Sequence, residues 1–325
     1  MSTETTGQLS GLDPGARAFL EKMDSLRAPP FFKMSAARAR KALSDLQAST
    51  PVPMMPAEVR EIDIPGGPTG HVRAHIVRPQ GREEALSVTL YYHGGGWVLG
   101  GFDTHERLVR DLANKTNAAV VFVDYPLSPG AKYPVITGAG YRALEYIADN
   151  GPRYNLDSSR LAVAGDSVGG NMATVLSMMA KEHDGPDIAL QVLIYPVTDA
   201  GLETGSFRRF ATGLWLERDE MKLSWDNYLP DKAARKEPMA SPLRASTDQL
   251  KGLPPALVIT CEYDVLRDEG EAYAHKLISA GVPTTAVRFL GTIHDLVMLN
   301  ALADTPAAKS AVEMTCDGLR YAFAP

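Results

Sequence analysis

The pattern of apolar and polar residues changes character near residue 56. Before it, apolar residues recur with helical spacing in two stretches, 19–26 and 43–46, which the pair Pro29-Pro30 separates. After it come two alternating runs, VREIDIP and HVRAHIVRP, joined by the turn sequence GGPTG. This pattern predicts two N-terminal helices followed by an antiparallel hairpin.

Six further runs of β-branched and aromatic residues follow the hairpin, and helical patterns separate most of them. They are SVTLYYH, AAVVFVDY, RLAVAGD, LQVLIYP, ALVITCEYD and TTAVRFL. Short strands that alternate with helices indicate a mainly parallel sheet covered by helices on both faces. We therefore predict an α/β fold of three layers, with the working residues at the carboxyl ends of the strands.

The stretch between LQVLIYP and ALVITCEYD has no obvious strand, and about residues 200–235 it carries apolar residues that suggest helices. We expect a helical cap there, inserted in a catalytic domain of residues 56–325. The segment 1–55 is expected to form the other half of the cap. A chain of 325 residues is long enough for one large domain with such an insertion.

Composition excludes several classes of function. The net charge is −6 and the basic residues are scattered, so we expect no nucleic-acid partner. No apolar run approaches the roughly 18 residues of a membrane span, and the start, MSTETTGQLSGLDPG, lacks the pattern of a secretion signal. We expect a cytoplasmic protein, in which Cys261 and Cys316 are buried small hydrophobic residues.

The sharpest chemical signal is GDSVG at 165–169, which is a G-x-S-x-G sequence between the strand RLAVAGD and the helical run NMATVLSMMAKEH. The glycines allow a sharp turn that exposes the hydroxyl of Ser167 at the top of the sheet. A tight turn with an incidental serine is the simpler alternative. The strand and helix on either side favour a nucleophile.

A serine hydroxyl needs a base, and the chain has seven histidines. His294 follows the last strand on the short loop GTIH, where a base belongs in this fold, whereas the other candidates suit surface or packing positions. The third member is a carboxylate between serine and histidine in chain order. Asp264 ends ALVITCEYD and fits, with Asp199 as a rival that also suits a turn or cap role.

Fixed donors for the negative oxygen of a tetrahedral intermediate are expected from the run HGGGW at 93–97. It follows the strand SVTLYYH, and its glycines let backbone N–H groups approach a substrate closely. We predict that the donors are the N–H groups of Gly94, Gly95 and Val168, and that Gly96 shapes the turn.

Apolar residues of the expected cap are candidates for the acyl and alcohol pockets. They are Phe207, Phe210, Leu214 and Trp215, together with Trp97. Packing inside the cap is an equally good interpretation of these side chains. No metal-ligand spacing or dinucleotide fingerprint with the right context is present, so we predict neither a metal nor a cofactor.

These motifs together resemble the bacterial hormone-sensitive-lipase-like esterases, the family IV carboxylesterases. The resemblance runs from about Leu86 to His294. It rests on HGGGW at 93–97, DYPLSPGAKYP at 124–134, GDSVGGN at 165–171 and YDVLRDEG at 263–270. It implies a serine, histidine and aspartate triad, a helical cap, hydrolysis of short- to medium-chain acyl esters without a cofactor, and a homodimer as one assembly the family forms.

Two departures from the family pattern bear on chemistry. Val168 replaces the usual alanine beside the nucleophile, and Asp295 stands beside the base where the family has a small residue. We hypothesise that a carboxylate at 295 raises the pKa of His294.

Two alternatives remain open at this point. The same site could cleave amides, lactones or carbamates. A ligand-binding protein is the non-enzymatic alternative, because plant gibberellin receptors resemble the family but have lost the histidine that His294 supplies here.

Overall fold

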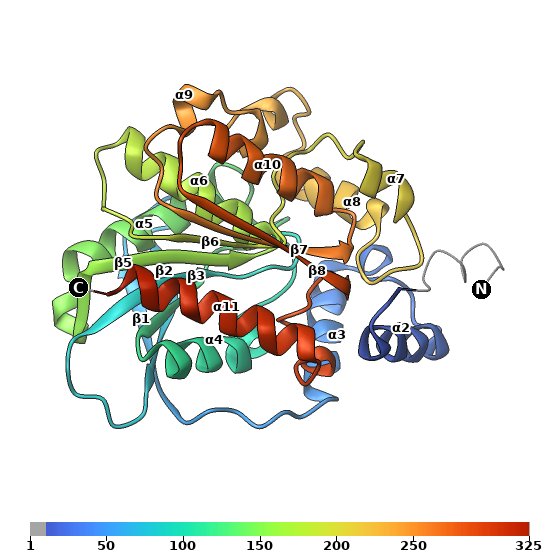
Figure 1. Cartoon of the computed structure of the whole chain (residues 1–325), viewed down its shortest axis with the longest axis horizontal. Coiled ribbons are helices and arrows are strands. Elements are labelled where there is room, and N and C mark those ends of the chain that lie inside the picture. The colour runs from blue at the N-terminus through green and yellow to red at the C-terminus, as the bar shows by residue number, and fades with distance from the viewer. Residues whose placement is uncertain (1–10, 325) are drawn as a thin grey trace.

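A single twisted sheet of eight strands crosses the protein in the computed structural model, which describes residues 11–324 (Figure 1). The strand order is β1-β2-β4-β3-β5-β6-β7-β8. The strands are β1 (Ala57–Pro65), β2 (His71–Pro79), β3 (Leu86–Tyr92), β4 (Ala119–Asp124), β5 (Leu156–Asp166), β6 (Gln191–Ile194), β7 (Ala256–Tyr263) and β8 (Thr284–Ile293).

The sheet is antiparallel only at one edge. Strand β2 pairs antiparallel with both β1 and β4, and every pair from β4 to β8 is parallel. All seven residues of β3 are buried, as expected for a central strand with helices on both sides. The predicted α/β fold, with its N-terminal hairpin and mainly parallel sheet, is confirmed.

Helices cover both faces of the sheet, and each face has its own hydrophobic core. Helices α4 and α11 enclose one core, and α5, α6 and α10 enclose the other (Figure 1). The α-helices are α2 (Pro14–Leu26), α3 (Ala36–Ala48), α4 (Phe102–Thr116), α5 (Val135–Asn150), α6 (Val168–Glu182), α7 (Gly205–Arg209), α8 (Arg218–Tyr228), α9 (Thr247–Leu250), α10 (Arg267–Ser279) and α11 (Pro306–Ala322). Short 3₁₀ helices are η1 (Phe31–Lys33), η2 (Gly151–Tyr154), η3 (Ala234–Lys236), η4 (Pro242–Arg244) and η5 (Asn300–Leu302).

Two separate parts of the chain meet beyond the carboxyl ends of β7 and β8. They are the N-terminal helices α2 and α3 and the inserted helices α7 and α8 (Figure 1). The ring of Trp215, from the inserted segment, packs edge-on against Phe19 at 5.1 Å and Phe31 at 5.6 Å between ring centroids. Residues 1–10 of the expected cap segment lie outside the described residues, and the division of the chain at residue 56 stays a prediction.

The loop after β8 is held from two sides. Gln47 of α3 donates from Nε2 to the carbonyl of Met298 at 2.9 Å, and its Oε1 accepts from the N–H of Asn300 at 2.9 Å. Arg107 of α4 is also buried and donates to the carbonyl of Met298 at 3.0 Å. An N-terminal helix thus helps to hold the loop that begins at His294.

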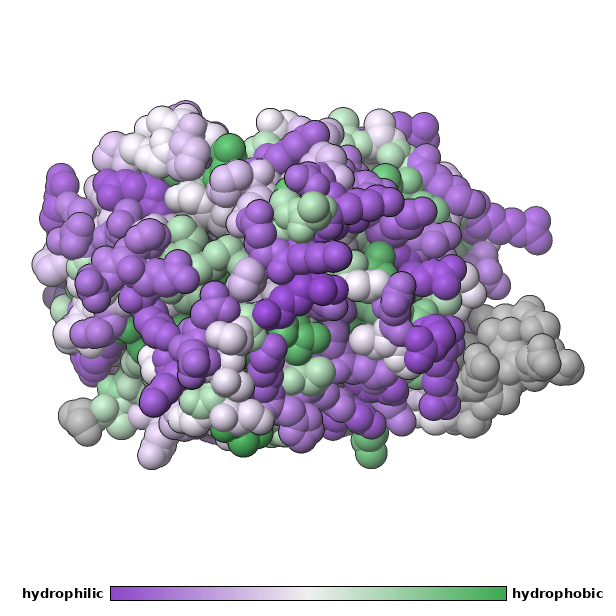
Figure 2. Space-filling view, turned by 90° about the horizontal axis from the view of Figure 1, so that it is seen from above, coloured by the Kyte–Doolittle hydropathy of each residue, from purple (hydrophilic) through white to green (hydrophobic). Residues whose placement is uncertain are grey.

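The face of the protein shown in Figure 2 is mostly hydrophilic, with apolar side chains in small separate patches. Within residues 11–324, no helix combines the length and the apolar character needed to cross a membrane. Cys261 and Cys316 are buried and unpaired, which confirms the prediction that they act as small hydrophobic residues.

Replacing Gln47 with alanine is expected to lower the free energy of unfolding by about 1–3 kcal/mol, because buried backbone groups of the loop after β8 lose their partners. Denaturant unfolding of both proteins measures this difference. Lys41→Ala, on the exposed side of the same helix, is the control and should change stability by less than about 1 kcal/mol. Equal effects of the two substitutions would contradict the stabilising role of the hydrogen bonds from Gln47 to the loop after β8, which we call the Gln47 clamp.

Candidate active site

Ser167 sits in a strained turn between β5 and α6. Its φ is 56° and its ψ is −120°, values that residues other than glycine rarely adopt. A Cβ atom at Gly169 would lie 1.8 Å from the carbonyl oxygen of Tyr92, and one at Gly165 would lie 2.3 Å from the backbone of Gly169. Only glycine lets the turn press this closely on β3, and the strain follows from that contact.

The structure brings the three residues of the predicted triad together in series. His294 Nε2 lies 2.9 Å from Ser167 Oγ, and His294 Nδ1 lies 2.7 Å from Asp264 Oδ2. All three side chains are buried. The other carboxylate oxygen of Asp264 accepts the N–H of Leu266 at 3.0 Å, which fixes the orientation of the carboxylate. The geometry suits transfer of a proton from the hydroxyl to the imidazole.

The rival carboxylate, Asp199, is engaged elsewhere. Arg244 donates to its two oxygens at 2.6 and 3.1 Å, in a bidentate pair beside η4. Its backbone N–H donates to Glu269 at 3.2 Å. Of the two candidates, Asp264 is the one that contacts His294.

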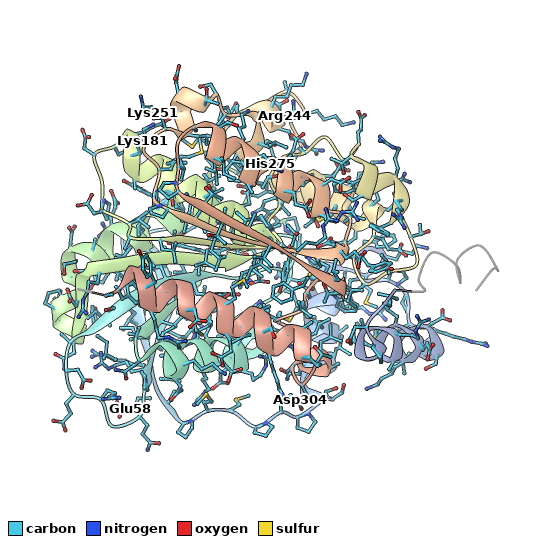
Figure 3. The ribbon with its side chains drawn as sticks, in the orientation of Figure 1. Glu58, Lys181, Arg244, Lys251, His275 and Asp304 are labelled. Atoms are coloured by element: carbon cyan, nitrogen blue, oxygen red, sulfur yellow. The ribbon has the colours of Figure 1, made fainter. Side chains whose placement is uncertain are left out.

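Of the histidines predicted to occupy surface or packing positions, four do so, whereas His105 lines the cavity beside Ser167 and lies 3.4 Å from Asp166. His71, His183 and His275 are exposed, and Figure 3 shows His275 on α10, on the outer side of the sheet. His75 pairs with Asp124 at 2.8 Å. Within residues 11–324, no group of three or more His, Cys, Asp or Glu residues is arranged to hold a metal ion.

Two carboxylates act on the imidazole of His294. Burial taken alone lowers its pKa, but the charges of Asp264 and Asp295 outweigh burial and raise the pKa of His294 to about 9. Asp295 Oδ1 lies 3.6 Å from His294 Nε2, while Asp295 Oδ2 accepts the indole N–H of Trp215 at 2.7 Å. The carboxylate of Asp295 thus lies where the hypothesis requires it, close enough to the imidazole to raise the pKa of His294.

The residues His93 to Trp97 form a glycine loop, and the set of N–H donors predicted there for the negative oxygen needs a correction. The N–H of Gly94 donates to Asp166 Oδ1 at 3.1 Å, so it is not a free donor for a substrate, and that prediction is wrong. The N–H groups of Gly95, Gly96 and Val168 make no hydrogen bond to another residue in the described chain. Gly95 and Gly96 have φ values of 105° and 64°, which explains the need for glycine.

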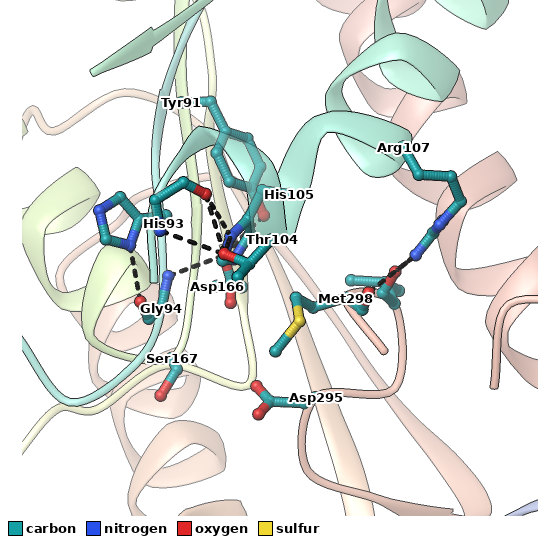
Figure 4. Close-up of polar contacts among 12 residues, drawn as sticks. Tyr91, His93, Gly94, Thr104, His105, Arg107, Asp166, Ser167, Asp295 and Met298 are labelled. Carbon is teal, nitrogen blue, oxygen red and sulfur yellow. Dashed lines mark hydrogen bonds and ion pairs between the residues drawn. The ribbon is translucent and has the colours of Figure 1, made fainter. Parts of the chain in front are cut away.

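Asp166 lies directly before Ser167 in the turn of residues 165–169, which we call the nucleophile turn. Its side chain joins this turn to the glycine loop (Figure 4). Besides Gly94, its Oδ1 accepts the hydroxyl of Tyr91 at 2.7 Å and lies 3.4 Å from Nε2 of the buried His105. Burial alone raises the pKa of Asp166, but the charge of His105 and the hydrogen bonds bring it below its ordinary value. A buried, ionised carboxylate therefore fixes the loop beside Ser167. No motif in the sequence predicted this role of Asp166.

A narrow cavity with about 30 Å³ of open volume adjoins the triad. It shares Phe31, Trp215 and Glu220 with a larger cavity of about 580 Å³ between the N-terminal helices and the inserted segment. Leu214 lines the larger cavity and Trp215 lines both, and their role in an acyl or alcohol pocket stays a prediction. Glu220, which lines both cavities from α8, was not predicted from the sequence.

Three of the predicted pocket residues are packing residues instead. Trp97 is fully buried and stacks on Tyr228 with 3.9 Å between ring centroids. Phe207 is buried too, and Phe210 packs against Tyr263 at 5.5 Å. None of the three lines the cavities next to Ser167. The pocket assignment of Trp97, Phe207 and Phe210 is therefore wrong, because an apolar side chain fills a core as readily as it lines a cavity.

A fold of this kind, with a strained serine turn and a histidine at the end of the last strand, defines the α/β hydrolases. Residues 89–298 match the family model described as alpha/beta hydrolase fold, Abhydrolase_3, and the chain belongs to this family.

Similar proteins bear esterase names. The chain is 35% identical to carboxylesterase NlhH of Mycobacterium tuberculosis, covering 99% of each chain, and 33% identical to an esterase of Gibberella moniliformis, covering 96% of this chain and 98% of the relative. Among solved structures, a thermostable esterase from Pseudomonas putida ECU1011 is similar with a TM-score of 0.95 and 46% identity, covering 97% of this chain and 99% of that one. The fold and these relatives together support a carboxylesterase.

Asp166→Asn is expected to lower kcat for 4-nitrophenyl acetate by about 10- to 100-fold, because the glycine loop loses a charged acceptor near the reacting oxygen. KM should change much less. Steady-state kinetics separate the two parameters. Asp157→Asn, at the other end of β5, is the control. A kcat for Asp166→Asn equal to that of the control would rule out the positioning role.

Asp295→Asn is expected to move the acid limb of the kcat/KM profile to lower pH. The base must be neutral to accept a proton, so activity falls as the pH falls through the pKa of His294. Removing the charge of Asp295 removes one of the causes that raise this pKa. A pH profile of both proteins on one aryl ester provides the measurement, and a limb that stays in place would refute the assignment.

Proposed function

We propose that the chain is a carboxylesterase of the hormone-sensitive-lipase-like group, which cleaves short- to medium-chain acyl esters through Ser167, His294 and Asp264. The observation that carries the proposal is the series of contacts of 2.9 and 2.7 Å that joins hydroxyl, imidazole and carboxylate. The esterase relatives and the α/β hydrolase family support it.

The proposed reaction is acyl transfer in two halves. In the first, His294 takes the proton of Ser167 Oγ as this oxygen attacks the ester carbonyl, and then gives the proton to the leaving alcohol. In the second, His294 takes a proton from water, which attacks the acyl-enzyme and releases the acid and free Ser167. Asp264 stays ionised and holds the Nδ1–H tautomer of the imidazole throughout.

The negative oxygen of each tetrahedral intermediate is proposed to lie against the N–H groups of Gly95, Gly96 and Val168. A single donor of this kind is worth about 3–4 kcal/mol of barrier in other hydrolases. Val168 is the first residue of α6, so its N–H also carries the partial positive charge of a helix N-terminus. The N–H of Gly94 fixes the position of the glycine loop by donating to the carboxylate of Asp166.

The cavities beside Ser167 offer space for an acyl chain. The cavity at Ser167 is narrow, and it shares lining residues with a larger space of about 580 Å³ lined by apolar side chains such as Leu20, Met23 and Leu46. This volume is typical of small-molecule sites. An apolar space of this size suits the acyl chain of an ester, and the preference for short to medium chains is proposed from the family resemblance.

Other functions fit less well. Amides, lactones and carbamates form the same type of intermediate, so matched ester and amide substrates must separate them. A receptor without catalysis does not need an imidazole in contact with both partners, as His294 is here. The homodimer and the cytoplasmic location stay predictions from the sequence.

A panel of 4-nitrophenyl esters with acyl chains of two to sixteen carbons tests the function. Ser167→Ala should lose roughly 10⁴-fold or more of the hydrolytic rate, because the attacking oxygen is gone. Asp264→Asn should also lose several orders of magnitude in kcat. Wild-type rates should peak at short to medium chains.

Ser177→Ala is a matched control, since Ser177 is a buried serine of α6, the helix that begins directly after Ser167, and it donates to the carbonyl of Ala173. It should keep near wild-type activity. Full activity of Ser167→Ala, or no labelling of Ser167 by an organophosphonate, would end the proposal.

A further inference from the structure

Two carboxyl groups that the proposed mechanism does not need face the reaction cavity. Asp295 follows His294 and has a positive φ of 62°, and Glu220 lies on helix α8 of the inserted segment. Both line the narrow cavity that also contains Ser167. Glu220 lines the two neighbouring larger cavities as well, so a substrate in any of the three spaces meets it.

Asp295 has a carboxylate oxygen, Oδ1, that accepts no hydrogen bond from the described residues, and the residue lines the cavity beside Ser167. Its side chain is buried, and Oδ1 has no hydrogen-bond partner among the described residues, although Oδ2 is satisfied by Trp215. Figure 4 shows the carboxylate of Asp295 on the loop after β8, directed toward Ser167. A buried carboxylate oxygen without a donor is costly, so the position is suited to a donor that arrives with the substrate.

Glu220 is also without a partner in residues 11–324, since no hydrogen bond or ion pair joins its carboxylate to another described residue. Burial and the nearby charge of Asp295 raise its pKa to about 8, and His294 opposes this shift. Both carboxyl groups line the same narrow cavity beside Ser167. A cation placed between them is attracted to both.

The walls of these cavities carry acidic groups but no lysine or arginine. Asp24, Asp45, Glu217 and Glu220 line the largest space, and Glu220 and Asp295 line the smallest. The basic side chains at the walls are limited to His105 and His294 in the smallest cavity. An anionic group on a substrate has no guanidinium or ammonium to meet among these lining residues.

We infer that Asp295 and Glu220 form a specificity site that favours esters carrying an ammonium group and disfavours esters carrying a carboxylate. This inference rests on the proposed esterase function. An ammonium group supplies both the positive charge and the N–H donor that Asp295 Oδ1 lacks. A carboxylate in the same place would add a third negative or partly protonated group to a poorly hydrated space.

Isosteric esters measure this preference. On the alcohol side the series is 2-(dimethylamino)ethyl, 3-methylbutyl and 2-carboxyethyl butyrate, which differ at one end in charge and little in shape. On the acyl side it is the methyl esters of 4-(dimethylamino)butanoic acid and 5-methylhexanoic acid, with monomethyl glutarate. At neutral pH the amines are protonated, and the ratio of kcat/KM within each series reports recognition of charge.

In at least one series, the ammonium ester is expected to exceed its neutral isostere by about tenfold, and the carboxylate ester to fall below it by about tenfold. Asp295→Asn and Glu220→Gln should each move both ratios toward one. The ratios are internal to one protein, so a variant that folds less completely still gives a valid answer. Asp219→Asn is the matched control, because Asp219 is exposed beside Glu220 on α8.

The outcomes separate this inference from the proposed function. One outcome is that Ser167-dependent hydrolysis is seen, but the ammonium, neutral and carboxylate esters of both series react at equal rates. This result overturns the specificity site and leaves the proposed esterase function in place. A uniform loss on all esters in Asp295→Asn, with unchanged ratios, shows that Asp295 acts only through His294 and also overturns it. No hydrolysis of any neutral ester overturns the function itself.

Discussion

The site depends on one close contact, the approach of the nucleophile turn to strand β3. Gly169 lies so near the carbonyl of Tyr92 that a Cβ atom would stand 1.8 Å from it. This contact forces Ser167 into a positive φ, starts α6 at once, and brings Asp166 within reach of the N–H of Gly94. The nucleophile and the glycine loop are therefore positioned by the same few backbone atoms, and neither can move without the other.

The sequence predicted the features that follow from strand ends and motif spacing. Ser167, Asp264 and His294 each come directly after a strand run, and parallel strands bring such positions to one edge of a sheet. It failed for Gly94, because the partner of that N–H is a carboxylate 72 residues away whose direction no local pattern reveals. The sequence also did not predict that Glu220 lines the cavities, because a charged residue in a helix rich in polar residues is expected to face solvent.

Trp215 connects the parts that enclose the site. Its ring packs on Phe19 and Phe31 of the N-terminal segment, and its indole N–H donates to Asp295 beside the imidazole of His294. One side chain of the inserted segment thus contacts the N-terminal helices and the neighbour of the base at the same time. The position of the inserted segment and the electrostatic environment of His294 are coupled through this residue.

The clamp that Gln47 forms on the loop after β8 has a consequence for the order of events during synthesis. Gln47 and Asn300 are 253 positions apart, and the hydrogen bonds between them join two distant segments of the chain. Contacts of such long range form late in folding. The hydrolytic machinery is therefore complete only after the segment that carries His294 and Asn300 has been synthesised.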